Sequence, residues 1–175
     1  MIAEIAPLLG RLLLAEIDAP LMALLSHPDV AAVLDQAEPG CGAWLENEHD
    51  LDELAADYCD LFVLPGGLAP VAGAWAEGVD RQDFLHRLAM VFPFESEIAS
   101  SFETPADHFG RLLTVLGRAT SPDASWSSPL IDLVGPPMAA FGEALANHPT
   151  IPPYRACGRL LMALLPPQGS SGRAL

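Results

Sequence analysis

The chain has 175 residues and a formal net charge of −15 at pH 7, with 51% apolar and 18% charged residues. This composition excludes an intrinsically disordered chain and predicts one domain that buries a substantial core. The acidic excess argues against binding to nucleic-acid phosphates or to an anionic membrane surface. A cationic partner is its natural electrostatic complement.

The sequence also favours a cytoplasmic protein. No basic segment precedes an apolar stretch at the N-terminus, so we expect no secretory signal. The longest uncharged stretch, residues 61–76, is interrupted by prolines and glycines and does not read as a membrane span. The cysteines, which are three in number and far apart, are expected to be reduced thiols: Cys41, Cys59 and Cys157.

Apolar residues recur at three- and four-residue steps in the first third of the chain, which predicts short helices. The first helix is expected from about residue 2, with Pro7 in its first turn, where a missing N–H is tolerated. Asp18 is expected to cap the second helix, and Pro28 to begin the third.

The clearest predicted helix covers residues 50–63. Asp50 and Glu53 resemble a capping box at its start. Pro65 and the two glycines after it end the helix and open a loop that runs to about residue 78. That loop is long for a compact domain, which suggests a functional role. The acidic residues between 46 and 53 are interpreted as a solvated face and a cap.

A helix is predicted over residues 81–91, ended by Pro93. The run from Thr104 to Asp107 predicts another helix start, with Thr104 as the N-cap, Pro105 in the first position and Asp107 in the third. This helix is expected to end near residue 120.

The last third predicts one or two helical turns over residues 129–134, an interruption at Pro136 and Pro137, and a helix over 138–147. The final helix is expected over residues 153–165. The fold class is therefore all-α, a single-domain bundle of about eight to ten short helices over residues 1–165. A disordered tail is expected over residues 166–175.

Motifs that carry enzyme chemistry are missing from the sequence. No hydrolase elbow, phosphate-binding loop or zinc-binding helix motif occurs, and no two histidines stand four residues apart. We therefore predict no catalytic residue, no metal and no cofactor.

Three segments, in their order and spacing, resemble one family. They are the helix end and loop Tyr58-Cys59-Asp60-Leu61-Phe62-Val63-Leu64-Pro65-Gly66, the segment Glu103-Thr104-Pro105-Ala106-Asp107-His108-Phe109-Gly110-Arg111-Leu112-Leu113, and His148-Pro149 followed by Tyr154-Arg155-Ala156. Together they resemble the TorD/DmsD/NarJ family of redox-enzyme maturation chaperones, and its DmsD-like branch most closely. The resemblance spans residues 8–165.

The resemblance implies a cytoplasmic, all-α and non-catalytic protein. Its implied partners are the twin-arginine signal peptide and the apo-form of a molybdopterin-dependent oxidoreductase subunit, which the chaperone holds until the cofactor is inserted. It also implies a peptide-binding groove. We add Trp75 to this groove because it is an aromatic residue in a loop and belongs to no apolar helix stripe that would place it in the core. The candidate groove residues are Tyr58, Leu61, Phe62, Pro65, Gly66, Trp75, Asp107, His108 and Phe109.

Other interpretations of these residues remain open. Tyr58, Leu61 and Phe62 lie at core spacing, and Asp107 suits any helix N-terminus. The chain is alternatively a helical interaction module that binds a basic or amphipathic helix, or a nucleotide-binding or small-molecule enzyme. We expect a monomer, with a dimer as the alternative. The client enzyme is not determined by the sequence.

Overall fold

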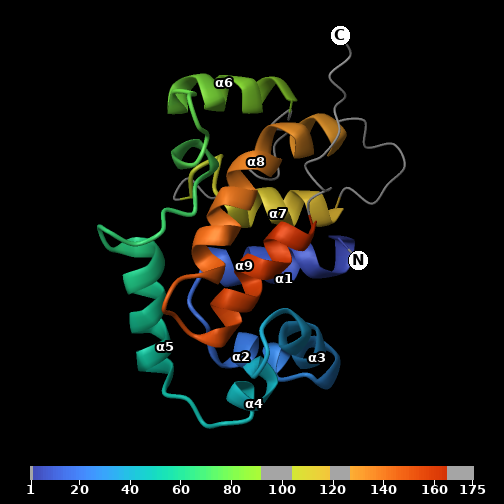
Figure 1. Cartoon of the computed structure of the whole chain (residues 1–175), viewed down its shortest axis with the longest axis vertical. Coiled ribbons are helices and arrows are strands. Elements are labelled where there is room, and N and C mark those ends of the chain that lie inside the picture. Colours follow the sequence, from blue (N-terminus) through green and yellow to red (C-terminus); the bar gives the residue numbers. More distant parts are fainter. Residues whose placement is uncertain (1, 92–103, 119–126, 165–175) are drawn as a thin grey trace.

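The computed structural model describes residues 2–91, 104–118 and 127–164. Within these ranges the chain forms nine α-helices and no strand, which confirms the all-α prediction. Figure 1 shows α6 at one end of the long axis, α3 and α4 towards the other, and α5 along one side. The helices are α1 (Ile2–Leu14), α2 (Ala19–Leu25), α3 (Pro28–Ala37), α4 (Cys41–Leu45), α5 (Leu51–Tyr58), α6 (Arg81–Val91), α7 (Phe109–Arg118), α8 (Ser127–Ala146) and α9 (Pro152–Leu164).

The predicted helix starts in the first third are confirmed, except that Pro7 lies inside α1 and not in its first turn. Asp18 caps α2, and its carboxylate accepts a hydrogen bond from the Leu21 N–H at 2.9 Å. Pro28 is the first residue of α3. Asp50 caps α5 and accepts from the Asp52 N–H at 2.9 Å. The aspartate oxygens accept hydrogen bonds from N–H groups that have no partner at a helix start, and a proline in the first turn removes one such N–H group.

The predicted helix over 50–63 changes its winding part-way. After α5, the turn Cys59–Val63 is π-helical, and the chain leaves it at Leu64 with an extended backbone. The Leu64 N–H donates to the Cys59 carbonyl, five residues back, at 2.8 Å. Two residues further on, Gly66 adopts a φ of 99°, a left-handed conformation that glycine accommodates without steric penalty.

The predicted helix start at Thr104 is wrong. The chain turns through Thr104–Asp107, and α7 begins only at Phe109. The cause is a tertiary pairing with the loop after α5. The Ala72 N–H donates to the Asp107 carbonyl at 2.8 Å, and the Phe109 N–H donates to the Pro70 carbonyl at 2.9 Å. These bonds hold the turn against the loop, and His108 becomes the residue that precedes the helix.

The predicted interruption at Pro136 and Pro137 is also wrong, because α8 continues through both prolines. A proline removes one helical N–H donor and normally breaks a helix. Here α8 lies along α9 for much of its length and buries Val134 and Met138 on either side of the prolines. Packing thus outweighs the local penalty. Pro93 and the expected tail 166–175 lie outside the described ranges.

Two helix pairs form the centre of the core, α1 with α7 and α8 with α9. Both pairs approach closely at glycines. A Cβ added to Gly10 would lie 2.8 Å from the Gly110 carbonyl oxygen, and one added to Gly142 would lie 2.9 Å from the Gly158 carbonyl oxygen. Glycine is thus required where the helix backbones meet. Among the described residues, no helix combines the length and apolar character needed to cross a membrane.

Candidate functional site

Two of the three segments that carry the family resemblance, together with the loop after α5, meet at Phe141 of α8. Phe141 is fully buried, and its ring lies 4.8 Å from Phe109, 5.6 Å from Trp75 and 6.4 Å from Phe62, measured between ring centroids. The Trp75 contact is edge-on, and the Phe109 contact is stacked. Both geometries are favourable for aromatic pairs. Phe141 therefore fixes the relative positions of the π-helical turn, the loop and α7.

The other predicted aromatic residues extend this cluster. Tyr58 packs edge-on against Phe62 at 5.2 Å, and its hydroxyl donates to the Leu13 carbonyl at 3.2 Å. Phe62 also meets Tyr154 at 5.4 Å. Leu61 is 1% exposed and belongs to the core. Its part in a site is therefore to support neighbouring side chains.

Asp107 has no exposed surface and is bonded within the chain. Its Oδ1 accepts from Arg81 Nη2 at 3.1 Å, and its Oδ2 accepts from Arg81 Nε at 3.3 Å. The Gly73 N–H donates to Oδ2 at 3.2 Å. This carboxylate ties together the loop, the start of α6 and the approach to α7. The hydrogen bond from Arg81 raises the pKa of that guanidinium.

His108 caps α7. Its Nδ1 accepts from the Gly110 N–H at 3.1 Å, while its carbonyl accepts from the Leu112 N–H at 3.1 Å. Burial lowers the pKa of the imidazole from 6.5 to about 4, although the adjacent Asp107 acts in the opposite direction. His108 is therefore neutral in the folded protein near pH 7, and its neutral Nδ1 accepts the capping bond.

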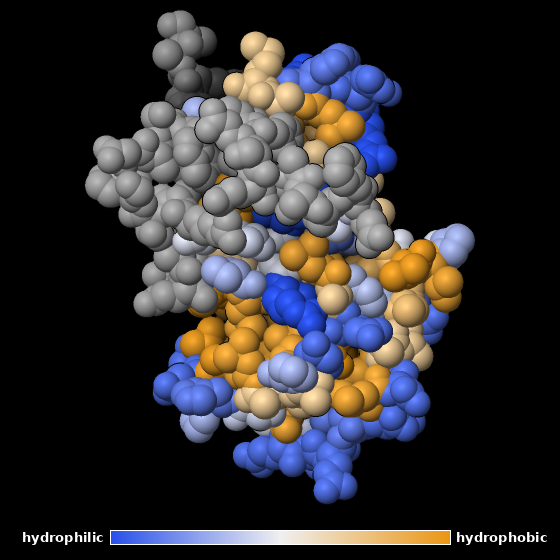
Figure 2. Space-filling view, turned by 180° about the vertical axis from the view of Figure 1, so that it is seen from behind, coloured by the Kyte–Doolittle hydropathy of each residue, from blue (hydrophilic) through white to orange (hydrophobic). Residues whose placement is uncertain are grey.

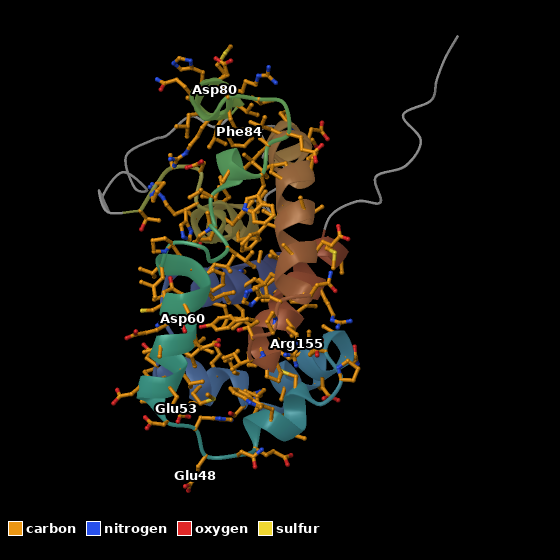
Figure 3. All side chains as sticks on the ribbon, turned by 60° about the vertical axis from the view of Figure 1, so that its left-hand side comes forward. Glu48, Glu53, Asp60, Asp80, Phe84 and Arg155 are labelled. Atoms are coloured by element: carbon orange, nitrogen blue, oxygen red, sulfur yellow. The ribbon has the colours of Figure 1, made fainter. Side chains whose placement is uncertain are left out.

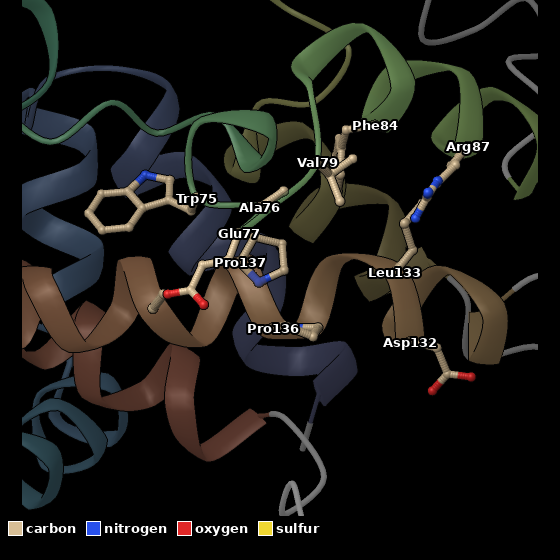
Figure 4. Close-up of a pocket in the computed structure, with 11 residues that line it drawn as sticks. Trp75, Ala76, Glu77, Val79, Phe84, Arg87, Asp132, Leu133, Pro136 and Pro137 are labelled. Carbon is tan, nitrogen blue, oxygen red and sulfur yellow. The ribbon is translucent and has the colours of Figure 1, made fainter.

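A cavity of about 420 Å³ lies between the loop, α6 and α8 (Figure 4). Trp75 is the predicted site residue that lines it. Arg87 extends from α6 towards Leu133, and Glu77 lies beside Pro137. The full lining is Trp75, Ala76, Glu77, Val79, Phe84, Arg87, Asp132, Leu133, Pro136, Pro137 and Ala140. The cavity combines an apolar wall with charged groups at its edge.

The two prolines of α8 change the chemistry of this cavity. Because neither proline has an N–H, the carbonyls of Asp132 and Leu133 lose their usual i→i−4 donors. Both residues line the cavity. Pro136 and Pro137 also line the cavity and add apolar ring surface to its wall. The prolines that the sequence indicated as a break thus contribute to the site.

The remaining predicted residues lie at the edge. Pro65 and Gly66 are exposed at the tip of the loop after the π-helical turn. Val63 and Leu64 beside them are 62% and 52% exposed. Figure 2 shows that hydrophobic areas interrupted by hydrophilic residues also cover the rear face of the molecule. Apolar surface at this loop tip is thus free to contact a partner.

Acidic side chains cover the outer side of α5. Glu48, Glu53 and Asp60 are exposed and point outward from α5 and its flanking turns (Figure 3). This agrees with the interpretation of the acidic run as a solvated face. The electric field of these carboxylates nevertheless reaches the neighbouring apolar loop tip, because the screening length at physiological salt is about 8–10 Å.

Sequence reasoning missed four contributors to this region: Phe141, Arg81, Phe84 and Glu77. Phe141 and Phe84 stand at ordinary core spacing, so nothing in the sequence marked them. Arg81 could have been found by asking which cation balances Asp107. Within the described ranges no group of histidines, cysteines and acids could hold a metal ion.

A second cavity, of about 560 Å³, lies between α1, α3 and α9. Its lining is mainly aliphatic, with Asp29 and Arg159 among the lining residues. It contains none of the predicted site residues. The two cavities share no lining residue and are therefore separate candidates for the surface that binds a partner.

The family model of the nitrate reductase delta subunit matches residues 27–150 of the sequence. The chain belongs to this family. The match includes α3 to α6, α7 and α8, and so covers the loop, the Asp107 contacts and the cavity. No curated protein matches the sequence significantly.

The delta subunit family is part of the TorD/NarJ group of redox-enzyme maturation chaperones, which confirms the resemblance. Its members act in molybdoenzyme maturation as chaperones and bind the catalytic subunit during that process. The DmsD-like branch stays a prediction from the sequence.

Proposed function

We propose that this delta subunit family member binds the twin-arginine signal peptide of its client's catalytic subunit in the cytoplasm and delays export until the molybdenum cofactor is inserted. The observation that carries the proposal is the cavity between the loop, α6 and α8. It lies in the part of the chain that the family model matches, and it adjoins the aromatic cluster at Phe141.

The cavity has the two properties that a twin-arginine signal requires. Such a signal has a basic segment followed by an apolar segment. Trp75, Phe84 and Val79 offer apolar contact area, and burying apolar surface contributes about 25 cal/mol per Å² before ordering costs. Glu77 offers a carboxylate acceptor for guanidinium N–H groups.

Long-range electrostatics favour the same partner. A protein of net charge −15 attracts a basic segment from a distance, which raises the association rate and weakens with salt. The exposed acids of α5 lie on the same side of the molecule as the apolar loop tip. Binding of an acidic or neutral peptide gains nothing from this field.

The proposal is tested by titrating a client signal peptide into the wild type and into two tryptophan variants. Trp75→Ala removes a cavity wall and is expected to weaken binding about tenfold or more, since a central aromatic contact typically contributes over 1 kcal/mol. Trp44→Ala is the matched control. Trp44 stacks on His49 at 3.7 Å and lines neither cavity, so its loss is expected to leave the affinity unchanged.

Equal affinities for wild type and Trp75→Ala would place the peptide elsewhere, with the cavity between α1, α3 and α9 as the next location to test. Absence of binding to the wild type would contradict the proposed function itself.

A further inference from the structure

The Asp107–Arg81 pair is unequal in exposure. The carboxylate is 0% exposed, whereas the Arg81 side chain is 51% exposed. Arg81 approaches side-on, so that Nε and Nη2 each donate to a different carboxylate oxygen. This fork geometry is specific to a guanidinium, because an ammonium group cannot donate two parallel bonds.

The carboxylate is held in place by contacts that do not involve Arg81. The Asp107 carbonyl accepts from Ala72, and its Oδ2 accepts from the Gly73 N–H. His108 pairs with Val71 in an isolated antiparallel bridge. The acceptor site is therefore built by the loop and the start of α7, and Arg81 is its occupant.

Gly73 shapes the site for a flat group. A Cβ at this position would lie 2.7 Å from Arg81 Cγ and 3.0 Å from Asp107 Oδ2. The first distance is shorter than real Cβ contacts and the second is tighter than most of them, so a Cβ here would displace the arginine side chain beside the carboxylate.

Arg81 stands where a cation is disfavoured. It is the first residue of α6, at the positive end of the helix dipole. Half of its side chain already faces water, so little surface must be rehydrated when it leaves. Asp107 is paired with one arginine. The carboxylate of Glu38, by contrast, forms ion pairs with two, Arg155 and Arg159 on α9.

We propose that Asp107, Gly73 and the surrounding backbone form a guanidinium-binding site in which Arg81 is an exchangeable occupant, replaced by an arginine of the bound polypeptide. The source of that arginine rests on the proposed function. The exchange releases the start of α6 from the loop. Because α6 supplies Phe84 and Arg87 to the cavity, this release widens the cavity for the rest of the peptide.

The first test needs no client peptide. Arg81→Ala empties the site, and thermal unfolding is then followed with millimolar methylguanidinium or methylammonium. We expect methylguanidinium to raise the melting temperature of Arg81→Ala in a saturable manner, and methylammonium to have no such effect. Wild type should show neither response, because its own arginine fills the site.

Arg11→Ala is the matched control, since Arg11 pairs with Asp18 at 2.8 Å in an open setting where both side chains are over a third exposed. It should show no guanidinium response. If Arg81→Ala does not fold, Arg81→Gln serves in its place. Equal effects of the two cations, or an equal response in Arg11→Ala, would overturn the site.

The second test separates the site from the proposed function. A twin-arginine peptide should bind Arg81→Ala more tightly than wild type, because an occupant present nine-tenths of the time lowers apparent affinity about tenfold. A Lys-Lys peptide should show no gain. Unchanged or weaker binding of the twin-arginine peptide would refute the exchange. A wild type and variant that both ignore the peptide would refute the proposed function, while methylguanidinium rescue would still establish the site.

Discussion

His108 makes the candidate site sensitive to acid. The free imidazole has a pKa of 6.5, and burial lowers it to about 4 in the folded protein. Between these values the unfolded chain binds more protons, so the free energy of unfolding falls as the pH drops through 6.5 towards 4. Stability from this residue is fully present above pH 6.5.

We expect the wild type to lose about 2 kcal/mol of this free energy between pH 7 and pH 5, measured by urea unfolding. His108→Asn is the control, because an asparagine oxygen can accept the Gly110 N–H bond but does not titrate. The variant should show a much flatter pH dependence. A slope equal to that of the wild type would mean that another group is responsible.

At the residue scale, the structure brings several of the candidate site residues together but gives one of them a partner that the sequence did not indicate. Phe62, Trp75 and Phe109 were predicted as candidate site residues, and all three meet at Phe141. Asp107 was predicted as a helix-start acid, yet its carboxylate binds Arg81, 26 residues away in sequence. Such a long-range ion pair has no local pattern and needs the fold to reveal it.

At the element scale, the packing of α8 on α9 depends on glycine. A Cβ at Gly158 would lie 2.5 Å from the Ala146 backbone nitrogen and 2.6 Å from the Gly142 carbonyl oxygen. Neither atom can move without shifting a helix. Gly158→Ala is therefore expected to lower the free energy of unfolding by about 1–3 kcal/mol, as overpacking in a core does.

The control for this change is Gly42→Ala in the short helix α4. Its nearest neighbouring atoms are those of Asp35, at 3.5 Å or more, which is ordinary contact. Alanine is the better helix former, so this variant should be neutral or slightly stabilised. Chemical denaturation of the two variants side by side gives the comparison. A Gly158→Ala variant as stable as Gly42→Ala would show that α8 and α9 can separate freely.

The predicted helix starts are correct where the capping contact is between residues close in sequence, and wrong where a distant segment pairs with the helix start. Asp18 and Asp50 cap their helices through residues two or three positions ahead. Thr104 has the same local signature, but loop residues 70–73 pair with the segment and delay α7 to Phe109. The prolines of α8 fail as a helix break for a related reason, since tertiary packing outweighs local preference.

At the scale of the whole molecule, composition and periodicity were sufficient for the fold class. A long series of apolar stripes broken by Pro and Gly yields short helices packed in one bundle, as Figure 1 shows. The cavity was not predictable, because α8, which supplies much of its lining, is far along the chain from the loop and α6 that complete it. The length of the loop and its aromatic residue Trp75 were the signals in the sequence that pointed to a functional region there.

The net charge of −15 also acts at this scale. Attraction of a basic peptide by the whole molecule is screened by salt, whereas a guanidinium held by a fork of acceptors is much less affected. Salt dependence and arginine dependence therefore report on two separable parts of recognition.

The measurement that tests the central claim most directly is a calorimetric titration of the client's twin-arginine signal peptide at low and moderate salt, with a Lys-Lys peptide beside it. We predict saturable binding that is at least several-fold weaker for the Lys-Lys peptide at both salt concentrations, because lysine cannot donate two parallel bonds. Equal binding of the two peptides would assign recognition to the apolar segment alone. Absence of binding for both would contradict signal-peptide recognition by this chaperone.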